Sequence, residues 1–506
     1  MPHSYNKGCY FKSLSDIQGK NVTVMGLGLN GGGEACVRFF LKHGANVLVT
    51  DMKTEEQLKS TVDSLMNDKD LDTSHLTFRL GEHRIEDFEN ADCVIKNPGV
   101  KYDGNKYLAA SKNIETDLSI FLAFSKAPVI AVTGSKGKSS TVSALYYGLK
   151  TAGFQAFLGG NITVSPLTFL EKTNQDTPVV IEFSSWQLSD LRGRGLLKPH
   201  ISIITKIVPD HQNWYGAMAP YVDDKKLIYA DQDKGCYSLF DFGEDEPGTG
   251  PENSKTWGEE FAKESKATIL RYWNQKLPEG TYGVWQEKDE NGNFRGQVLL
   301  PGMREPETIL GELSVPGDHM KTNVLNAALG MYLMGLPGSL IKKIMKDFPG
   351  VEHRLQYFHD KTFGNTTYKF YNDTCATVPD SVVAACKSFE TPVILLTGGT
   401  DKGLEFTKLT EYLTQNKDAV KDIYFLSGTA TDKVRPELEK AGIKYQGPFN
   451  SLDEMLHKVA ENLEKTADCN TKTQPVVFSP GATSFGMFKN EFDRGNQYMT
   501  KVKEIF

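Results

Sequence analysis

A glycine-rich turn between an apolar strand and a helix is the feature that most constrains the fold of this chain. Residues 129–133 (Val-Ile-Ala-Val-Thr) predict a buried strand, residues 134–139 (Gly-Ser-Lys-Gly-Lys-Ser) follow it directly, and a helix is predicted up to about Ala152. Glycines let the backbone wrap around a phosphate, and the helix N-terminus adds a favourable field. Val132 occupies the place of the first glycine in the full GxxxxGK[ST] pattern. The turn predicts a nucleotide site; the alternative is a glycine turn that only caps a helix.

A second glycine-rich turn, near the N-terminus, has the spacing of a dinucleotide fingerprint. Gly26, Gly28 and Gly31 follow the apolar residues 22–25. Asp51 lies about 20 residues further on, at the end of the next predicted strand, where a ribose hydroxyl would be bound. On spacing alone this pattern favours an NAD-dependent enzyme. Another nucleotide or diphosphate, and a tight turn without a ligand, remain as alternatives.

The length of 506 residues corresponds to about three domains of ~150 residues. Strand–turn–helix patterns in three successive segments predict the α/β class with parallel sheets. We expect a Rossmann-like N-terminal domain, a central P-loop ATPase-type parallel-sheet domain and a Rossmann-like C-terminal domain, with boundaries at 1–113, 114–349 and 350–506. The sequence pattern of the central domain changes at about 231–314, which indicates an insertion. Asn291-Gly292 predicts a hairpin within it.

The composition limits the kinds of partner that the protein can bind. Charged residues make up 24% and the net charge is −7, which argues against electrostatic binding of nucleic acid or anionic lipid. The sequence has no apolar run of about 18 residues and no secretion signal at its start, so we expect no membrane association. Its seven cysteines form no CxxC pair, which predicts reduced thiols in a cytoplasmic protein.

Polar residues follow two further predicted strands of the central segment. Glu182 ends the strand at 178–181, and Asp210 and His211 follow the strand at 200–204. Beside a P-loop, a carboxylate and an imidazole could hold Mg²⁺ or orient a phosphate. The alternative is that they are hydrogen-bonded loop anchors.

Taken together, these motifs resemble the Mur ligases, the ATP-dependent amide-forming enzymes of peptidoglycan precursor synthesis. Within the family, the chain is most similar to the members that add D-glutamate to UDP-N-acetylmuramoyl-L-alanine. The matching segments fall in the family's order: 133–139, 159–161, 182–188, Asp210-His211, Asn323-x-x-Asn326-Ala, Asn372-Asp373-x-x-Ala-Thr377, 398–402 and 479–484.

The resemblance reassigns the first glycine turn from NAD to the UDP of a sugar nucleotide. It implies that the precursor is bound by five residues, Leu29, Asn30, Asp51, Gly99 and Asn161.

For ATP, the resemblance implies contacts from Gly134, Ser135, Lys136, Gly137, Lys138, Ser139, Ser140, Asn326, Arg354 and Asp373. It assigns catalysis to Lys138, His211 and Lys225, and two Mg²⁺ ions to Ser139, Glu182, His211 and Lys225. Lys225 would serve as a carbamylated lysine, since a carbamate turns a cation into an anionic ligand. From the residues alone, Lys225-Lys226 instead predicts a solvated helix face.

For D-glutamate, the resemblance implies Thr377, Lys402 and Ser484. Cys375 replaces a lysine that is usual in the D-glutamate enzymes, and this motivates the alternative of a related Mur ligase with another amino acid or precursor. Other departures are Lys136, Pro209, Asn213, Gln356 and the order Glu491-Phe492. An NAD-dependent oxidoreductase and a catalytically silent sugar-nucleotide binder are the remaining alternatives. We expect a monomer with small-molecule substrates.

Overall fold

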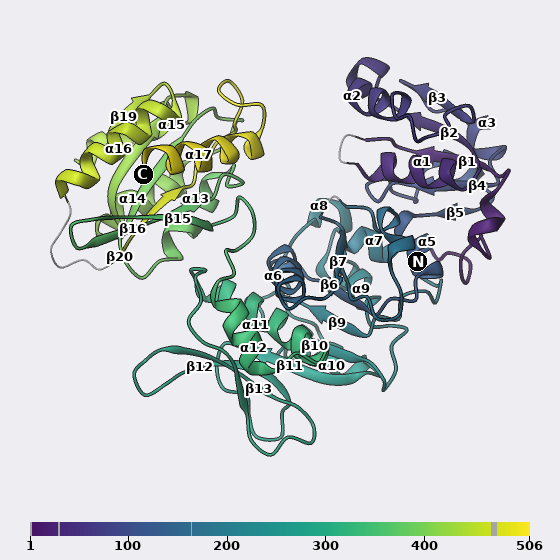
Figure 1. Ribbon diagram of the computed structural model, residues 1–506, viewed down its shortest axis with the longest axis horizontal. Helices are drawn as coiled ribbons and strands as arrows, with labels where there is room; N and C mark the ends of the chain where they lie inside the picture. The colour runs from purple at the N-terminus through teal and green to yellow at the C-terminus, as the bar shows by residue number, and fades with distance from the viewer. Residues whose placement is uncertain (1–2, 29–30, 163, 467–472) are drawn as a thin grey trace. The chain divides into compact units, whose positions relative to one another are not determined.

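The computed structural model describes residues 3–28, 31–162, 164–466 and 473–506. Three sheets, mainly parallel and covered by helices, confirm the predicted α/β class (Figure 1). The chain forms two compact units, and each is described by itself. The first is Met1–Gly311 with Thr322–Ile344, and the second is Glu312–Lys321 with Met345–Phe506.

The first sheet is parallel and has the order β3-β2-β1-β4-β5. Its strands are β1 (Asn21–Met25), β2 (Asn46–Asp51), β3 (Leu76–Leu80), β4 (Cys93–Lys96) and β5 (Ile114–Glu115). Its helices are η1 (Leu14–Ile17), α1 (Gly32–Lys42), α2 (Glu55–Met66), α3 (Glu86–Glu89) and α4 (Lys106–Ala110). The N-terminal glycine-rich turn thus lies between β1 and α1, at the carboxyl edge of the sheet. Ligands bind at this edge in such folds.

The central sheet has nine strands in the order β14-β13-β12-β11-β10-β9-β6-β8-β7. They are β6 (Val129–Thr133), β7 (Phe157–Gly160), β8 (Val179–Glu182), β9 (Ile201–Ile204), β10 (Tyr237–Asp241), β11 (Thr268–Trp273), β12 (Gly283–Lys288), β13 (Phe294–Leu299) and β14 (Glu307–Leu310). The insertion therefore extends the sheet. Its last three strands pair antiparallel, and β12 and β13 form the hairpin that Asn291-Gly292 predicts.

The helices of this segment connect and cover the strands. They are α5 (Asp117–Phe124), α6 (Lys138–Thr151), η2 (Pro166–Thr168), η3 (Leu170–Lys172), α7 (Ser185–Ser189), α8 (Gln212–Tyr215), α9 (Met218–Lys226), α10 (Trp257–Glu264), α11 (Asp318–Leu333) and α12 (Gly338–Lys346).

The third sheet has the order β15-β16-β20-β17-β18-β19, and only β15 and β16 pair antiparallel among its described strands. The strands are β15 (Gln356–Phe363), β16 (Thr366–Asn372), β17 (Val393–Gly398), β18 (Val420–Leu426), β19 (Gln446–Phe449) and β20 (Thr473–Phe478). The helices are α13 (Pro379–Lys387), α14 (Thr407–Gln415), η4 (Lys417–Ala419), α15 (Thr429–Lys440), α16 (Leu452–Thr466) and α17 (Glu491–Ile505). Successive residues of β17 enter separate apolar clusters, Leu395 in one and Ile394 and Leu396 in the other, because side chains alternate along a strand.

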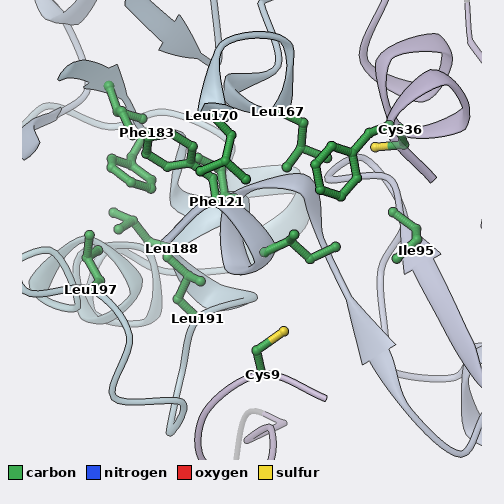
Figure 2. Close-up of a cluster of buried hydrophobic side chains, with 14 of the residues drawn as sticks. Cys9, Cys36, Ile95, Phe121, Leu167, Leu170, Phe183, Leu188, Leu191 and Leu197 are labelled. Atoms are coloured by element: carbon green, nitrogen blue, oxygen red, sulfur yellow. The ribbon is translucent and has the colours of Figure 1, made fainter. Parts of the chain in front are cut away.

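One apolar core joins the first and central sheets into a single compact unit. Figure 2 shows Cys36 and Ile95 of the first sheet's segment in the same cluster as Phe121, Phe183 and Leu188. Burial of so much apolar surface is the main favourable term in keeping the two sheets together.

Two buried ion pairs reinforce this junction. Lys96 Nζ, at the end of β4, donates to Asp190 Oδ2 over 2.8 Å, and Arg194 lies 3.1 Å from Glu115. Both pairs are nearly inaccessible to solvent. Removing one partner would leave an uncompensated buried charge, so the pairs fix how β4 and β5 meet the segment after α7.

Six cysteines are described, all as free thiols, and Cys469 lies outside the described residues. Among the described helices, none combines the length and apolar character needed to cross a membrane.

Candidate active site

The turn after β6 requires its two glycines. Gly134 and Gly137 have φ of 141° and 94°, in the region that favours glycine. A Cβ on Gly134 would lie 2.0 Å from Thr205 Oγ1, and one on Gly137 would lie 2.4 Å from Asn323 Oδ1. The turn therefore passes close to both neighbours and delivers the chain into α6 with no side-chain cap, so the helix N-terminus is open for an anion.

Ser135 holds this turn in place instead of facing a ligand with its own hydroxyl. Its Oγ donates to Val208 O and accepts from the Tyr221 hydroxyl. The backbone N–H groups of Ser135 and Lys136 both donate to Lys206 O. These two amides are therefore already hydrogen-bonded within the protein.

Lys138 begins α6, and its ammonium folds back over the turn. Nζ donates to the carbonyls of Gly134 (2.9 Å) and Ser135 (3.0 Å). A lysine held in this way has its charge at the helix N-terminus, where the terminal phosphates of a nucleotide would lie.

Lys225 is buried beside the same turn, so the solvated helix face is the wrong interpretation of this residue. Only 1% of it is exposed, and its Nζ donates to Gly134 O over 2.8 Å. Its ammonium also lies 4.4 Å from the centre of the Tyr221 ring. Burial, and next the Lys138 charge, hold the pKa of Lys225 well below its usual range. Lys226, in contrast, pairs with Glu260 and Glu264.

Glu182, the last residue of β8, is a buried carboxylate with one oxygen to spare. Oε1 accepts from Asn161 Nδ2 over 2.7 Å, whereas the buried Oε2 has no hydrogen-bond partner among the described residues. An unpartnered buried carboxylate oxygen is costly unless a ligand satisfies it. It is the kind of atom that a hard divalent cation binds.

His211 stands at the N-terminus of α8 with an unusual left-handed backbone, φ 51°. Its ring lies 4.9 Å from Trp186 and 6.3 Å from Tyr221. Over the described residues, no group of three or more His, Cys, Asp or Glu side chains is arranged to hold a metal. The set expected from the sequence has only two such members, Glu182 and His211, beside Ser139 and Lys225.

Asn326 is a second buried polar group without a partner. It is fully buried in α11, and neither its amide nitrogen nor its amide oxygen has a hydrogen-bond partner among the described residues. Asn323, one helical turn earlier, contacts the Gly137 position. A free amide so close to the P-loop helix fits the recognition of a nucleobase edge.

In the first sheet, Asp51 has a structural task. Its Oδ2 accepts from the amides of Leu27 (2.9 Å) and Gly28 (3.2 Å), and its Oδ1 accepts from Lys53. A cavity of about 210 Å³ lies beside the turn; its lining includes Gly26, Gly28, Lys96, Asn97, Pro98, Asn161 and Gln187. Asn161 is thus brought to the same cavity as the glycine turn. Gly99 is exposed after the Asn97-Pro98 turn, and Leu29 and Asn30 lie outside the described residues.

The third sheet holds the remaining expected residues in the second unit. Lys402 Nζ lies 3.4 Å from Thr377 Oγ1, so two expected acceptor residues are in contact. Asp373 follows β16 and accepts from Ser479 Oγ over 2.7 Å, and burial raises its pKa to about 7. The charge of Arg354 acts on the same carboxyl in the opposite direction.

Comparison with known proteins provides independent evidence about the family of this chain. The family model of the Mur ligase middle domain matches residues 132–330, and that of the MurD-like N-terminal domain matches residues 20–116. Proteins named UDP-N-acetylmuramoylalanine–D-glutamate ligase from Treponema pallidum and Borreliella afzelii are 36% and 37% identical to this chain. Both alignments cover 97% of this chain. They cover 98% of the Treponema protein and 99% of the Borreliella protein.

The chain belongs to the Mur ligase family.

Solved structures of Mur ligases have the same fold at lower identity. The UDP-N-acetylmuramate-alanine ligase of Thermotoga maritima is 18% identical with a TM-score of 0.53, over 96% of this chain and 99% of that one. A MurF structure from Acinetobacter baumannii is 14% identical with a TM-score of 0.53, over 98% of this chain and 93% of that one.

Three residues that contact or support expected site residues or their neighbours were given no role from the sequence. A Cβ on Gly33 would lie 2.3 Å from Leu27 O, so Gly33 allows α1 to approach the glycine turn. Arg494 is buried and donates to Thr374 O (2.8 Å) and Ala482 O (3.0 Å), and burial lowers its pKa to about 10. Tyr221 supports both Ser135 and Lys225. A run of three glycines (31–33) was the available signal for Gly33; nothing local marks Arg494.

Proposed function

We propose that the chain is an ATP-dependent ligase that joins D-glutamate to the L-alanyl carboxylate of UDP-N-acetylmuramoyl-L-alanine, in peptidoglycan precursor synthesis. The observation that carries the proposal is near-complete coverage, at 36–37% identity, by relatives that bear this activity in their names. The P-loop with Lys138 supports the same reaction, because it supplies backbone amides and a cation for phosphoryl transfer.

ATP first phosphorylates the alanyl carboxylate, which gives an acyl phosphate and ADP. Charge spreads over the oxygens of the transferring phosphoryl group, so positioned cations and amides do most of the work. Lys138 and the open N-terminus of α6 supply them. We assign the adenine to Asn326 and the ATP phosphate and ribose to Arg354 and Asp373.

Two Mg²⁺ ions would be held by Ser139, Glu182, His211 and Lys225. They would neutralise phosphate charge and orient the reacting oxygens. The spare Oε2 of Glu182 fits this role. Lys225 fits it as a carbamate: its lowered pKa favours the neutral amine, whose nitrogen can attack CO₂ and release a proton. The carbamate that forms is an anion.

The amine of D-glutamate next attacks the acyl phosphate, and inorganic phosphate leaves as the amide forms. Thr377, Lys402 and Ser484 would bind the acceptor, with Lys402 as the point charge for a carboxylate. Leu29, Asn30, Asp51, Gly99 and Asn161 would bind the nucleotide precursor. Because water would hydrolyse the acyl phosphate, the site must exclude it during the reaction.

We further propose three domains with boundaries near residues 113 and 349, a monomeric enzyme and a cytoplasmic location. Support comes from the three separate sheets and from the free thiols of the described cysteines.

The experiment that tests the proposal is phosphate release with ATP, Mg²⁺ and UDP-N-acetylmuramoyl-L-alanine, with D-glutamate compared with a panel of amino acids. Release that requires both the precursor and D-glutamate is expected. Release with a different amino acid would favour the second candidate, which Cys375 motivates: a Mur ligase with another acceptor. Restoring the usual charge with Cys375→Lys would then show whether this position selects the acceptor. No release with any amino acid would contradict the proposal.

A further inference from the structure

Residues 3–11 form no helix or strand, yet they are held at the junction of the first and central sheets. Cys9 and Phe11 are buried in the apolar core that the two sheets share, and Figure 2 shows Cys9 in this cluster. The Phe11 ring lies 5.7 Å from the Phe40 ring of α1. Residues near a chain end are ordered where such contacts tie them down. We call residues 3–11 the strap, and apolar packing anchors its C-terminal end.

The middle of the strap pairs with the loop that follows α7. The amides of Tyr5 and Gly8 donate to the carbonyl oxygens of Arg192 (3.0 Å) and Arg194 (2.7 Å). The Arg194 guanidinium also lies 4.4 Å from the centre of the Tyr5 ring, which is a cation–π contact. Backbone and side-chain contacts together therefore fix Tyr5 against this loop.

The Tyr5 hydroxyl completes one of the two buried ion pairs. It donates to Asp190 Oδ1 over 3.1 Å, while Lys96 Nζ donates to Oδ2 over 2.8 Å. Burial raises the pKa of Asp190, and Lys96 and the Tyr5 hydroxyl act in the opposite direction. Burial also raises the pKa of Tyr5, so its hydroxyl stays protonated and remains a donor. Tyr5 thus helps to keep Asp190 ionised and paired with Lys96.

Asp190 and its partner Lys96 come from two walls of the cavity at the N-terminal glycine turn. Lys96 itself lines this cavity, as do Asn97 and Pro98, which follow it. Asp190 directly follows α7, and Gln187 of that helix lines the same cavity. The ion pair therefore sets the spacing between the Asn97-Pro98 turn and α7, and the strap acts on both walls at once.

The strap also contacts the chain on the far side of the Asn97-Pro98 turn. The ring of His3 stacks on that of Tyr102, with 3.5 Å between the ring centres. The Tyr5 ring lies 6.1 Å from the Tyr102 ring in an edge-on arrangement. The turn is therefore held before residue 97 by an ion pair and after it by aromatic packing.

We propose that the strap positions the precursor site by holding the Asn97-Pro98 turn against α7, with Tyr5 as the central positioning residue. This inference rests on the proposed function, because it takes the cavity at the glycine turn as the site of the nucleotide precursor. A turn that is already ordered costs less free energy to order in the complex, so the strap raises the affinity for the precursor. None of these contacts involves a P-loop residue, so ATP binding should not depend on the strap.

The first test is the deletion of one hydroxyl, with a matched control. Tyr5→Phe removes the donor to Asp190 and keeps the ring. Tyr10→Phe makes the same change in the same segment, at a ring that packs 5.0 Å from Phe11. In calorimetry on the full chain, Tyr5→Phe should weaken binding of UDP-N-acetylmuramoyl-L-alanine about tenfold, and Tyr10→Phe should stay within about twofold. Equal affinities in the two variants would overturn the inference.

Kinetics distinguish positioning from a general loss of stability. In phosphate release, the KM for the precursor should rise about tenfold in Tyr5→Phe, with kcat and the KM for ATP unchanged. Loss of folded protein alone would lower the amount of active enzyme and leave each KM unchanged. That second pattern would overturn the inference.

A pair of glycine variants displaces the strap by another route. Gly193 and Gly195, in the loop after α7, have φ of 79° and 64°, so alanine is strained at both positions. A Cβ on Gly193 would lie 2.2 Å from Ser4 Oγ, whereas the nearest atom to one on Gly195 is Lys7 Cε at 3.9 Å. Gly193→Ala should therefore bind the precursor about fivefold more weakly than Gly195→Ala. Equal binding by these two variants would contradict a role of the strap.

Hydrogen exchange of the ligand-free chain separates this inference from the proposed function. The amides of residues 97–102 should exchange about fivefold faster in Tyr5→Phe than in wild type or Tyr10→Phe, because the turn loses one of its supports. The P-loop amides of residues 134–140 should exchange at one rate in all three proteins. Unchanged exchange at 97–102 would overturn the inference, even if the wild type forms the expected product. Faster exchange, in a chain whose wild type does not bind the precursor, would support the strap's hold on the turn and contradict the proposed function.

Discussion

Two glycine turns in the first unit end in similar helix caps and differ in their chemistry. Each follows a buried parallel strand and ends in a glycine with positive φ that caps a helix: Gly31 (81°) before α1 and Gly137 (94°) before α6. At the turn after β6, two lysines, Lys138 and the buried Lys225, donate to the carbonyl of Gly134. In the turn after β1, a carboxylate, Asp51, accepts from the turn's own amides.

The difference teaches that glycines provide the shape of an anion site and that neighbouring charges decide its use. A cation at the turn after β6 favours highly charged phosphates whose charge grows during the reaction. At the turn after β1, a carboxylate already accepts from the amides. The weaker positive field there suits a ligand that is bound but does not react at that turn. The spacing that favoured NAD at the N-terminal turn could not make this distinction, since it reports shape alone.

The largest effect is expected at Lys138. Lys138→Ala should lower the rate of phosphate release about 10³-fold or more, because it removes the cation nearest the transferring phosphoryl group. Affinity for the nucleotide precursor, measured by calorimetry, should not change. The matched control is Lys136→Ala, an exposed lysine of the same turn, which should keep most of the activity. Retained turnover in Lys138→Ala would break the comparison between the turns.

The next effect is expected at the second lysine, Lys225. Lys225→Ala should reduce turnover about 10²-fold or more, and formate or acetate should restore part of it by taking the place of the carbamate. Since the low pKa of Lys225 makes carbamylation favourable, wild-type activity should also fall when CO₂ is removed. Lys226→Ala, which loses only a partly exposed ion pair, serves as the control. Full activity of Lys225→Ala without rescue would remove the lysine from the site.

A third prediction concerns the shape of the N-terminal turn. Gly33→Ala places a Cβ 2.3 Å from Leu27 O and should destabilise the turn by about 1–3 kcal/mol. The KM for the precursor should rise about tenfold, with kcat and the KM for ATP unchanged. In Gly32→Ala the Cβ meets no atom within 4 Å, so this variant should behave as wild type. Equal KM values in the two variants would show that the turn does not bind the precursor.

The smallest effect is expected in the third sheet, on the pH dependence of stability. There a carboxyl group, that of Asp373, follows strand β16 in place of a glycine turn. Burial raises the pKa of Asp373 from 3.8 to about 7. Below pH 4 the carboxyl is protonated in both folded and unfolded chains. Between pH 4 and 7 only the unfolded chain ionises, so the stability contributed by Asp373 is lost as pH rises through this window. Asp373→Asn should flatten that slope in chemical unfolding, and the exposed Asp380→Asn should not. Identical slopes in Asp373→Asn and wild type would contradict the raised pKa.

Much of the local structure was predictable, because it depends on neighbours in the sequence. The strand at 129–133 and the helix after it have the predicted bounds, since an apolar run followed by Gly134 and Gly137 leaves few alternatives. The insertion was predictable only in part: Asn291-Gly292 indicated the β12–β13 hairpin, whereas nothing local showed that β10 to β14 add in sequence order to the central sheet beside β9. Arg494 was missed because one of its hydrogen bonds reaches back 120 residues to Thr374.

By itself, the sequence determined the α/β class, the two glycine turns, the order of the family motifs and the identities of most candidate residues, because these follow from local pattern and composition. The tertiary structure decided which groups are charged, paired or free. Lys225 would be an ordinary surface lysine by its neighbours alone, and burial beside Gly134 lowers its pKa well below the usual range. Spacing predicts Asp51 as a ligand, and only the structure shows that its carboxylate also accepts from the amides of Leu27 and Gly28. Burial and long-range contacts set these properties, and neither is encoded within a short stretch of chain.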